Sequence, residues 1–344
     1  MFTPKNVTLD HLEKLPKETF FEKALLNLPD ENLLADLTIR RGNGRNDYPL
    51  SILWKGLLAY VAFKCTSIED LKKQIEKTPL LQTLFPSFPP PSSFSRFSHL
   101  LNKCDASLKK LHSQLLERVC RKPVLAIGFF QGTHLLWDTF SKLPLYFEKA
   151  KPNEPPEAGA LRLLSDLYSS SPQVIQRAEY LIGDSSYENL IESTWDLYRL
   201  KPIIPLDDRP PSKTTFRNAQ YDEKGGVYCI GKQNPNSMIF AGFEKDRMSL
   251  KYRCMANHYG TSCGKEDNCP LWKGLRIPLS TDRKIFTPLP RSSYRWKSIF
   301  KTYETKDALE KMLYSFPNRK YKQRVQLYSL LLLAASLADH KVDK

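Results

Sequence analysis

The pattern of apolar and polar positions along the chain changes once, near Pro123. Before that point it predicts helices almost throughout. Residues 52–64 are apolar on all sides, which is typical of a buried helix, and residues 67–77 form an amphipathic helix with a polar start. We therefore expect residues 1–122 to form an all-helical domain.

Beyond Pro123, short apolar runs replace the helical period. Three strand-like segments, PVLAIGFF, THLLWD and KLPLYFEKAKP, come first, and helices then alternate with strands at 180–183 and 201–206. This order predicts an α/β fold for residues 123–206. Residues 207–279 are polar and contain four cysteines, which predicts a β-rich or loop-rich insertion. A helical pattern returns in residues 280–344.

The charge balance narrows the classes of partner. The 344 residues include 52 Lys and Arg against 37 Asp and Glu, a net charge of +15. Such a surplus favours polyanions, either nucleic acid or an anionic membrane. The most apolar run, at 325–338, is too short to span a membrane, so we expect a packed helix and no membrane association. The start of the chain lacks a secretion signal, and seven cysteines favour a reducing cytoplasm over a disulfide framework.

One short strand ends on a carboxylate. In YLIGDSSYENLIESTW (180–195), apolar residues lead into Gly183 and Asp184, and two serines then open a helix. A strand-end carboxylate can bind Mg²⁺, and two such ions can activate a water molecule and stabilise the leaving oxygen of a phosphodiester. The alternative is that Asp184 only caps the next helix, where Ser185 and Glu188 also fit a capping box.

Several segments resemble, in order, the landmarks of bacterial insertion-sequence transposases. NDYPLSILWKGLLAYVAFKCTSIEDLKKQIEKTPLLQTLF and PPSSFSRFSHLL are similar to the N-terminal domain of that family. VLAI, KLPLYFEKAKPNEPPEAGALRLL, YLIGDSSYEN and PRSSYRWKSIFKTYETKDALEKML are similar to its DDE catalytic domain. The resemblance implies a ribonuclease-H-like mixed sheet with flanking helices, divided between residues 123–206 and 280–344, and an N-terminal domain that binds DNA.

The same resemblance implies an activity and its requirements. The family carries out DNA transposition, a form of DNA recombination in which a mobile element is cut at its ends and joined to a target. Three acidic residues hold two Mg²⁺ (or Mn²⁺) ions, double-stranded DNA is the partner, and the protein works as a homodimer in the bacterial cytoplasm, at the nucleoid.

The first two acidic positions match the family only in part. By position, Asp184 corresponds to the second catalytic Asp, whereas Gly128 stands in the place of the first. An internal deletion explains the loss most simply. Asp138, at the end of THLLWD, is the nearest substitute, and a surface turn is the alternative explanation for it.

The third acidic position falls on Asp307. Glu304 and Glu310 flank it at a spacing of three, which places all three acids near one helical face. A solvated charged face explains them as well as a metal site does. Two functions therefore stay open: a transposase that cleaves and joins DNA, and a catalytically inactive remnant that binds DNA without cleaving it.

A second candidate metal site lies in the insertion. Cys254, His258, Cys263 and Cys269 supply four ligands suited to a closed, tetrahedral structural Zn²⁺ site. Their spacing lacks a CxxC pair, however, so reduced thiols beside a surface histidine are the alternative.

Three segments mix Lys and Arg with Tyr, Trp, Asn and Ser, the side chains that neutralise phosphates or donate hydrogen bonds to them. The candidate DNA-binding residues in these segments are Arg40, Arg41, Arg45, Arg291, Arg295, Lys297, Arg319 and Lys320. A charge run alone is usually a solvated face, but the net charge of +15 favours at least one DNA contact.

Overall fold

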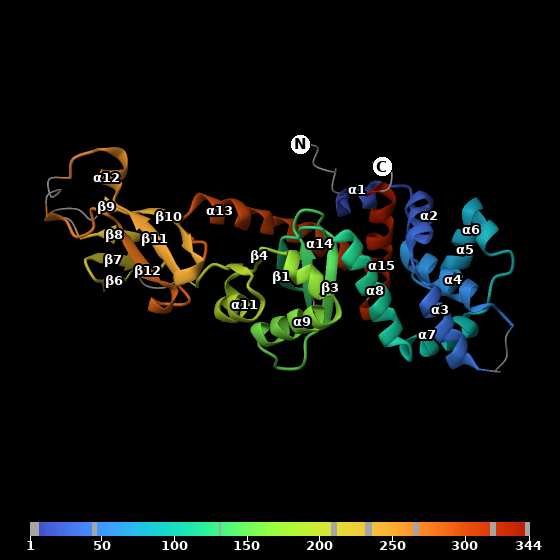
Figure 1. The fold of residues 1–344 in the computed structure, drawn as a ribbon. Coiled ribbons are helices and arrows are strands. Elements are labelled where there is room, and N and C mark those ends of the chain that lie inside the picture. Colours follow the sequence, from blue (N-terminus) through green and yellow to red (C-terminus); the bar gives the residue numbers. More distant parts are fainter. Residues whose placement is uncertain are drawn as a thin grey trace.

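The described part of the chain forms three regions in a row. The structure, a computed structural model, describes residues 7–42, 47–130, 132–207, 212–230, 236–263, 268–316 and 321–340. A region of helices stands at one end, a mixed sheet with its helices in the middle, and a β-rich insertion at the other end (Figure 1).

Within residues 7–122, every described element of regular structure is a helix, as the periodicity predicts. The helices are α1 (Leu9–Lys14), α2 (Lys17–Asn27), α3 (Glu31–Arg41), α4 (Leu50–Ala62), α5 (Ile68–Lys77), α6 (Pro79–Leu84), α7 (Pro91–Asn102) and α8 (Asp105–Val119). The start of α5 follows the expected pattern, because the Ser67 hydroxyl accepts a hydrogen bond from the Asp70 amide at 3.1 Å. The central helix α4 is buried on most of its surface.

The central sheet is mixed, which confirms the coarse α/β prediction. Its strands are β1 (Leu125–Phe130), β2 (Thr133–Asp138), β3 (Pro144–Lys149), β4 (Tyr180–Ile182) and β5 (Lys201–Ile203), in the spatial order β3-β2-β1-β4-β5. Strand β2 runs antiparallel to both of its neighbours, while β4 and β5 run parallel to β1. The short apolar runs of the sequence are these strands.

Helices cover both faces of the sheet. They are α9 (Pro156–Ser170), α10 (Pro172–Arg177), α11 (Leu190–Tyr198), α13 (Tyr294–Lys301) and α14 (Lys306–Tyr314), with short 3-10 turns η1 (Ser185–Tyr187) and η5 (Thr302–Thr305). Because side chains alternate along a strand, His134 and Trp137 of β2 point to opposite faces. His134 meets α9 at Gly159, where an added Cβ would lie 2.1 Å from the His134 ring. Trp137 meets η5, where its ring stacks on Tyr303.

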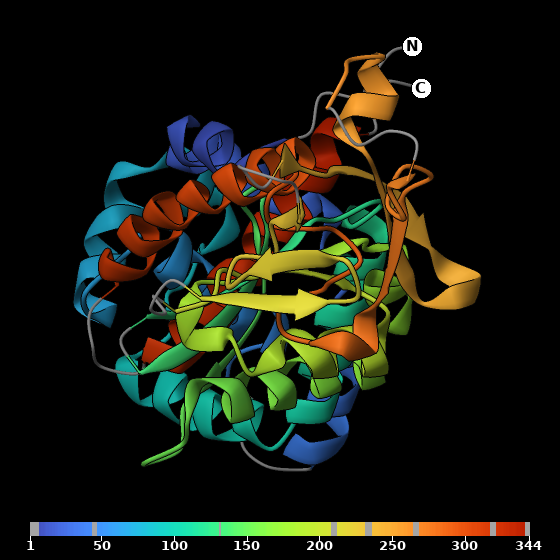
Figure 2. The same cartoon turned by 90° about the vertical axis from the view of Figure 1, so that its left-hand side faces the viewer.

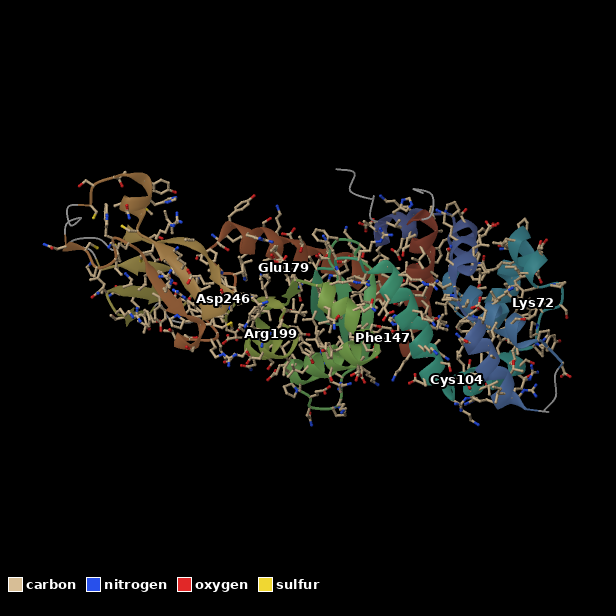
Figure 3. The ribbon with its side chains drawn as sticks, in the orientation of Figure 1. Lys72, Cys104, Phe147, Glu179, Arg199 and Asp246 are labelled. Carbon is tan, nitrogen blue, oxygen red and sulfur yellow. The ribbon has the colours of Figure 1, made fainter. Side chains whose placement is uncertain are left out.

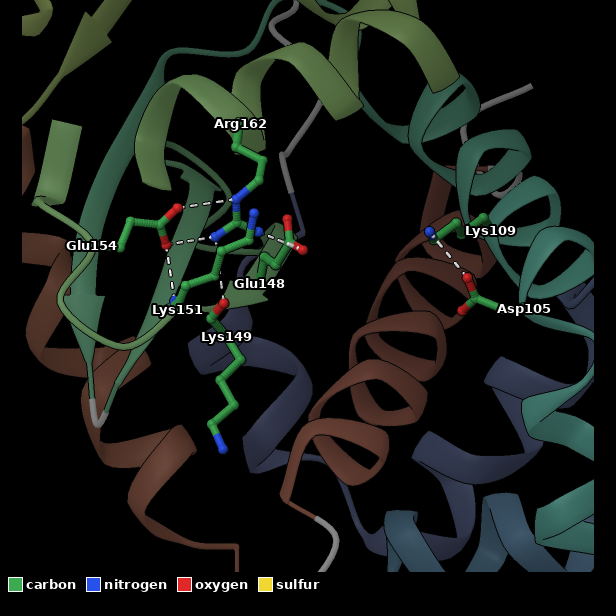
Figure 4. A network of polar contacts seen from close by, with 7 residues as sticks. All are labelled: Asp105, Lys109, Glu148, Lys149, Lys151, Glu154 and Arg162. Carbon is green, nitrogen blue, oxygen red and sulfur yellow. Dashed lines mark hydrogen bonds and ion pairs between the residues drawn. The ribbon is translucent and has the colours of Figure 1, made fainter. Parts of the chain in front are cut away.

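An ion-pair network fixes α9 to the strand beneath it. Arg162 of α9 pairs with Glu148 of β3 at 2.5 Å and with Glu154 of the connecting loop at 2.7 Å (Figure 4). The hydrogen bond from Arg162 lowers the pKa of Glu154 to about 2. The turn between β3 and α9 is therefore closed by a guanidinium that two carboxylates share.

The insertion forms a separate small core. It contains a four-stranded sheet, β6 (Lys213–Phe216), β7 (Ala219–Asp222), β8 (Val227–Cys229) and β9 (Asn236–Ser237), and a three-stranded sheet, β10 (Ile239–Glu244), β11 (Ser249–Arg253) and β12 (Leu275–Pro278). A short helix, α12 (Met255–Tyr259), follows β11, and Figure 2 shows these strands in front of the central region. The core includes Ile285 and Phe286, so the insertion packs as a unit that extends past residue 279.

The C-terminal helix packs with the N-terminal helices. The helix α15 (Tyr321–His340) lies against α2, α4 and α8 and touches β3 (Figure 1). The Ser329 hydroxyl donates to the Pro144 carbonyl at 2.9 Å, which ties α15 to the edge of the sheet. Its apolar run is buried, as expected of a packed helix. Within the described residues, no helix combines the length and the apolar character that crossing a membrane requires.

Candidate functional site

Asp184 stands where β4 ends, in extended backbone with φ −81° and ψ −179°. It is partly buried. Its Oδ1 accepts hydrogen bonds from the amide of Ser186, at 3.1 Å, and from the Ser186 hydroxyl. Asp184 therefore caps η1, which confirms the capping that the sequence offered as the alternative, although through Ser186 rather than through a Ser185–Glu188 box.

The second oxygen of Asp184 faces a phenol. The Tyr303 hydroxyl lies 3.1 Å from Asp184 Oδ2 and 2.9 Å from the carbonyl oxygen of Ile127. Tyr303 is buried, and burial together with the charge of Asp184 raises the pKa of its hydroxyl. The phenol therefore keeps its proton and donates it to these acceptors. Both carboxylate oxygens are hydrogen-bonded.

Aromatic rings fill the place opposite Asp184. Ala126 of β1 pairs with Ile182 of β4, and two more residues along these parallel strands bring Gly128 level with Asp184 on the same face. A Cβ at Gly128 would lie 2.9 Å from the Phe130 ring and 3.2 Å from the Trp137 ring. A carboxylate in the position of the family's first Asp would have to displace these rings.

Asp138 lies at the far end of the same strand pair. It is opposite Leu125, three residues before Gly128, which corresponds to about 10 Å along the sheet. Its carboxylate accepts hydrogen bonds from the Val124 amide at 2.9 Å and from the Ser141 amide at 3.0 Å. Only 9% of Asp138 is exposed. Asp138 organises the turn after β2, and the structure does not bring it to Asp184.

The three acids after α13 face solvent. Glu304 and Asp307 are exposed, and Glu310 accepts a hydrogen bond from the Tyr314 hydroxyl at 3.3 Å. Tyr303, the residue before Glu304, is the one that reaches Asp184. Among the described residues, no three His, Cys, Asp or Glu side chains form a group that could hold a metal ion. This donor set does not fit a two-Mg²⁺ centre at Asp184.

The candidate zinc ligands are spread over the insertion. Cys254 is buried at the start of α12, and Cys269 packs against the insertion core. Cys263 is exposed, while the His258 ring lies against Tyr259, 4.9 Å between centroids. All seven cysteines belong to the described residues, and each is a thiol. The predicted set of four does not gather in the described structure.

One side of α13 is basic and exposed. Trp296 and Phe300 point to the sheet side, so Tyr294, Lys297 and Lys301 share the outward side. We call Tyr294, Lys297 and Lys301, together with the exposed Arg295 on the side of the helix next to Glu179, the α13 basic face. Tyr294 is 86% exposed. The Arg295 side chain is 62% exposed, lies over the Tyr180 ring and pairs at 3.5 Å with Glu179, which Figure 3 labels beside the central sheet.

Arg291 is not part of that surface, which corrects the sequence prediction. It is 8% exposed. Its guanidinium donates to the Ile204 carbonyl at 2.9 Å and to the Ile285 carbonyl at 3.0 Å. Arg291 therefore joins the end of β5 to the insertion core, where DNA has no access.

Two of the early arginines line a hollow in the helical region. Arg40 pairs with Asp36 at 2.9 Å, and Arg41 donates to the Tyr48 carbonyl at 2.9 Å. Both line a cavity of about 290 Å³. Arg96 lines the same cavity and was missed because it is the only Lys or Arg of α7 and forms no charge run. The other candidates, Arg45, Arg319 and Lys320, lie outside the described residues.

Lys301 was missed as well, although it follows Lys297 by one helical turn and the spacing alone would have indicated it. Tyr303, which follows α13 in η5, connects the α13 basic face to the strand-end carboxylate of Asp184.

The chain matches no family model, no curated protein and no solved structure.

Proposed function

We propose that this chain is a DNA-binding protein on the scaffold of an insertion-sequence transposase, which contacts DNA without cleaving it. The α13 basic face carries the proposal. It presents Arg295, Lys297 and Lys301 together with the phenol of Tyr294 on one exposed helix. Cations of this kind neutralise backbone phosphates, and a phenol donates hydrogen bonds to them.

The topology of the central sheet supports the scaffold. The resemblance implies a ribonuclease-H-like mixed sheet with flanking helices. Here the order is β3-β2-β1-β4-β5, with β2 as the antiparallel strand. The sequence segments that resemble the transposase catalytic domain correspond to β1, β3, β4 and α13. The topology and the ordered segments therefore favour the same fold.

The acidic positions favour binding over cleavage. Two-metal cleavage of a phosphodiester requires carboxylates from separate elements around one point. Among the described residues no three His, Cys, Asp or Glu side chains gather at that point, Asp184 is hydrogen-bonded through both oxygens, and aromatic rings close the position at Gly128. Asp138 serves a turn elsewhere. Of the two functions left open by the sequence, the inactive DNA-binding remnant fits this geometry better.

The DNA contact should be electrostatic and independent of the base sequence. If the three basic side chains each neutralise one phosphate, the released counterions give a slope of about −3 in a plot of the logarithm of the binding constant against the logarithm of the salt concentration. We do not propose base recognition, because no described feature of α13 indicates that it enters a groove of the DNA. The homodimer implied by the resemblance also stays a prediction.

Fluorescence anisotropy with a labelled duplex tests the proposal. We expect binding that weakens steeply between about 50 and 200 mM salt and is the same in EDTA as in Mg²⁺. A supercoiled plasmid incubated with the protein and Mg²⁺ or Mn²⁺ should stay intact. Absence of duplex binding at low salt would overturn the proposal. Metal-dependent nicking that Asp184→Ala abolishes would overturn it in favour of the transposase.

A further inference from the structure

We propose that Asp184 is a positioning residue, which holds the α13 basic face against the sheet through Tyr303 and does not bind a divalent cation. This inference rests on the proposed DNA contact of α13. It assigns the strand-end carboxylate a structural task in DNA binding.

The helix α13 is attached to β4 at both ends of that strand. Glu179 stands just before β4 and pairs with Arg295, near the start of α13. Asp184 stands just after β4 and accepts the hydrogen bond of Tyr303, which follows the end of α13. The two acids that flank one short strand therefore hold the two ends of one helix.

The two attachments differ in strength. The Arg295–Glu179 pair is 3.5 Å long and both side chains are about half exposed, so water and salt screen it. The Tyr303 hydroxyl is buried, and its bond to a carboxylate at 3.1 Å is charge-assisted. The end at Asp184 is thus the firm one.

A row of stacked rings leaves the two hydrogen bonds of the Tyr303 hydroxyl, to Asp184 and to the Ile127 carbonyl, to fix the position of α13. Trp296 stacks on Phe300 at 4.9 Å, Phe300 on Tyr303 at 6.0 Å and Tyr303 on Trp137 at 5.5 Å. The interplanar angles are 18°, 14° and 28°. Stacked rings slide over one another at low cost, whereas a hydrogen bond to a fixed acceptor is directional. The carboxylate supplies that fixed acceptor because Ser186 holds its other oxygen.

The anchor and a metal site exclude each other at this carboxylate. A cation bound at Asp184 Oδ2 would repel the proton that Tyr303 directs toward the same oxygen. A two-metal centre would also need a second carboxylate, and the level position on β1 is Gly128, closed by Phe130 and Trp137.

Three variants separate the two roles. Asp184→Asn keeps the anchor, because an amide can donate to the Tyr303 oxygen while Tyr303 donates to Ile127. Tyr303→Phe removes both hydrogen bonds of the phenol, whereas Asp184→Ala removes the bond to the carboxylate and leaves the one to the Ile127 carbonyl. We expect Asp184→Asn to bind duplex DNA within about twofold of the wild type. Tyr303→Phe should bind roughly five- to tenfold more weakly and Asp184→Ala roughly three- to fivefold more weakly, each with an unchanged salt slope, because the same phosphates are contacted by a smaller population of positioned helix.

Ser185→Ala is the matched control, since it leaves the contacts of Asp184 with Ser186 and Tyr303 in place and should bind DNA as the wild type does. If Asp184→Asn weakens binding as much as Asp184→Ala does, the positioning role is wrong. The same holds if Tyr303→Phe, which is the variant least disruptive to folding, binds DNA as the wild type does.

Titration with Mn²⁺, followed by its electron paramagnetic resonance signal, gives an independent readout. The wild type and Asp184→Asn should leave the free Mn²⁺ signal equal; retention of Mn²⁺ by the wild type alone would overturn the inference. Thermal unfolding separates this result from a failure of the proposed function. If the wild type binds no DNA, a melting temperature lowered in Tyr303→Phe and preserved in Asp184→Asn still supports the anchor, and the reverse order contradicts it.

Discussion

The junction at Arg291 and the α13 basic face use the same kind of side chain in opposite surroundings. Arg291 is buried and donates to two backbone carbonyls, of Ile204 and Ile285. Arg295, four residues later, has a side chain that is 62% exposed. Both stand in PRSSYRWK, where sequence composition treats them alike.

The two regions differ in the role of water around each basic side chain. At the junction, the guanidinium replaces water as the partner of carbonyls that the fold has buried, so its removal should cost stability. On α13, Lys297 and Lys301 keep their water, and Arg295 keeps a solvent-screened pair with Glu179, until a polyanion displaces these partners, so removal of the cations should cost binding. The predictions below test this division, from the largest expected effect to the smallest.

Arg291→Ala should lower the free energy of unfolding by about 3 kcal/mol, because it leaves two buried carbonyls without their charged donor. Urea denaturation measures the loss. Arg295→Ala is the control and should change stability by less than about 0.5 kcal/mol. An unchanged urea midpoint for Arg291→Ala would show that water replaces the guanidinium.

His112 is a third basic side chain to compare, because it is buried and neutral in the folded protein. Burial lowers the pKa of His112 from 6.5 to about 4. As the pH falls below 6.5 the unfolded chain therefore takes up the proton first, and stability present above 6.5 is lost toward pH 4. We expect a loss of about 2 kcal/mol between pH 7 and pH 5.

Denaturation at several pH values checks this prediction. His112→Leu should flatten the profile over that range, whereas replacement of the exposed His99 by Gln should leave it unchanged. If both variants retain the wild-type profile, another group causes the loss.

The double variant Arg295→Ala/Lys297→Ala should weaken duplex binding about tenfold, which corresponds to about 1.4 kcal/mol. The salt slope should fall by about 2, one unit for each lost phosphate contact. Anisotropy titrations at several salt concentrations measure both quantities. Lys72→Ala/Lys73→Ala on α5 removes the same charge far from α13 (Figure 3). An equal effect of both double variants would mean that only net charge matters.

Arg40→Ala should have the smallest effect on stability, about 0.3 kcal/mol, because its pair with Asp36 is an exposed contact at helical spacing. Urea denaturation of both variants compares the stability loss of Arg40→Ala directly with that of Arg291→Ala. A loss of more than about 1 kcal/mol would place Arg40 with the structural arginines.

The parts of the fold that depend on local pattern could be predicted from sequence. Periodicity indicated the helices of residues 7–122 and the five central strands, and Ser67 marked the start of α5. Asp184 was found because a strand-end acid has a local signature. Its partner Tyr303 lies 119 residues away, and no local pattern specifies which residue of η5 turns inward.

The predictions for Arg291 and for the position at Gly128 were wrong for the same physical reason. Burial of Arg291 depends on the insertion core, which reaches Phe286 and so extends past the predicted boundary. Whether Gly128 leaves room for a carboxylate depends on how Phe130 and Trp137 pack above it. These are contacts between elements, which a single sequence does not reveal.

The packing of α15 has a consequence for how the protein is made. Its main partner is α2, roughly 300 residues earlier in the chain. While the ribosome is still translating, the early helices lack the surface that covers them, and their apolar sides stay open to chaperones or to one another. Emergence of α15, rather than emergence of the first domain, should therefore be the moment at which that region becomes resistant to proteases.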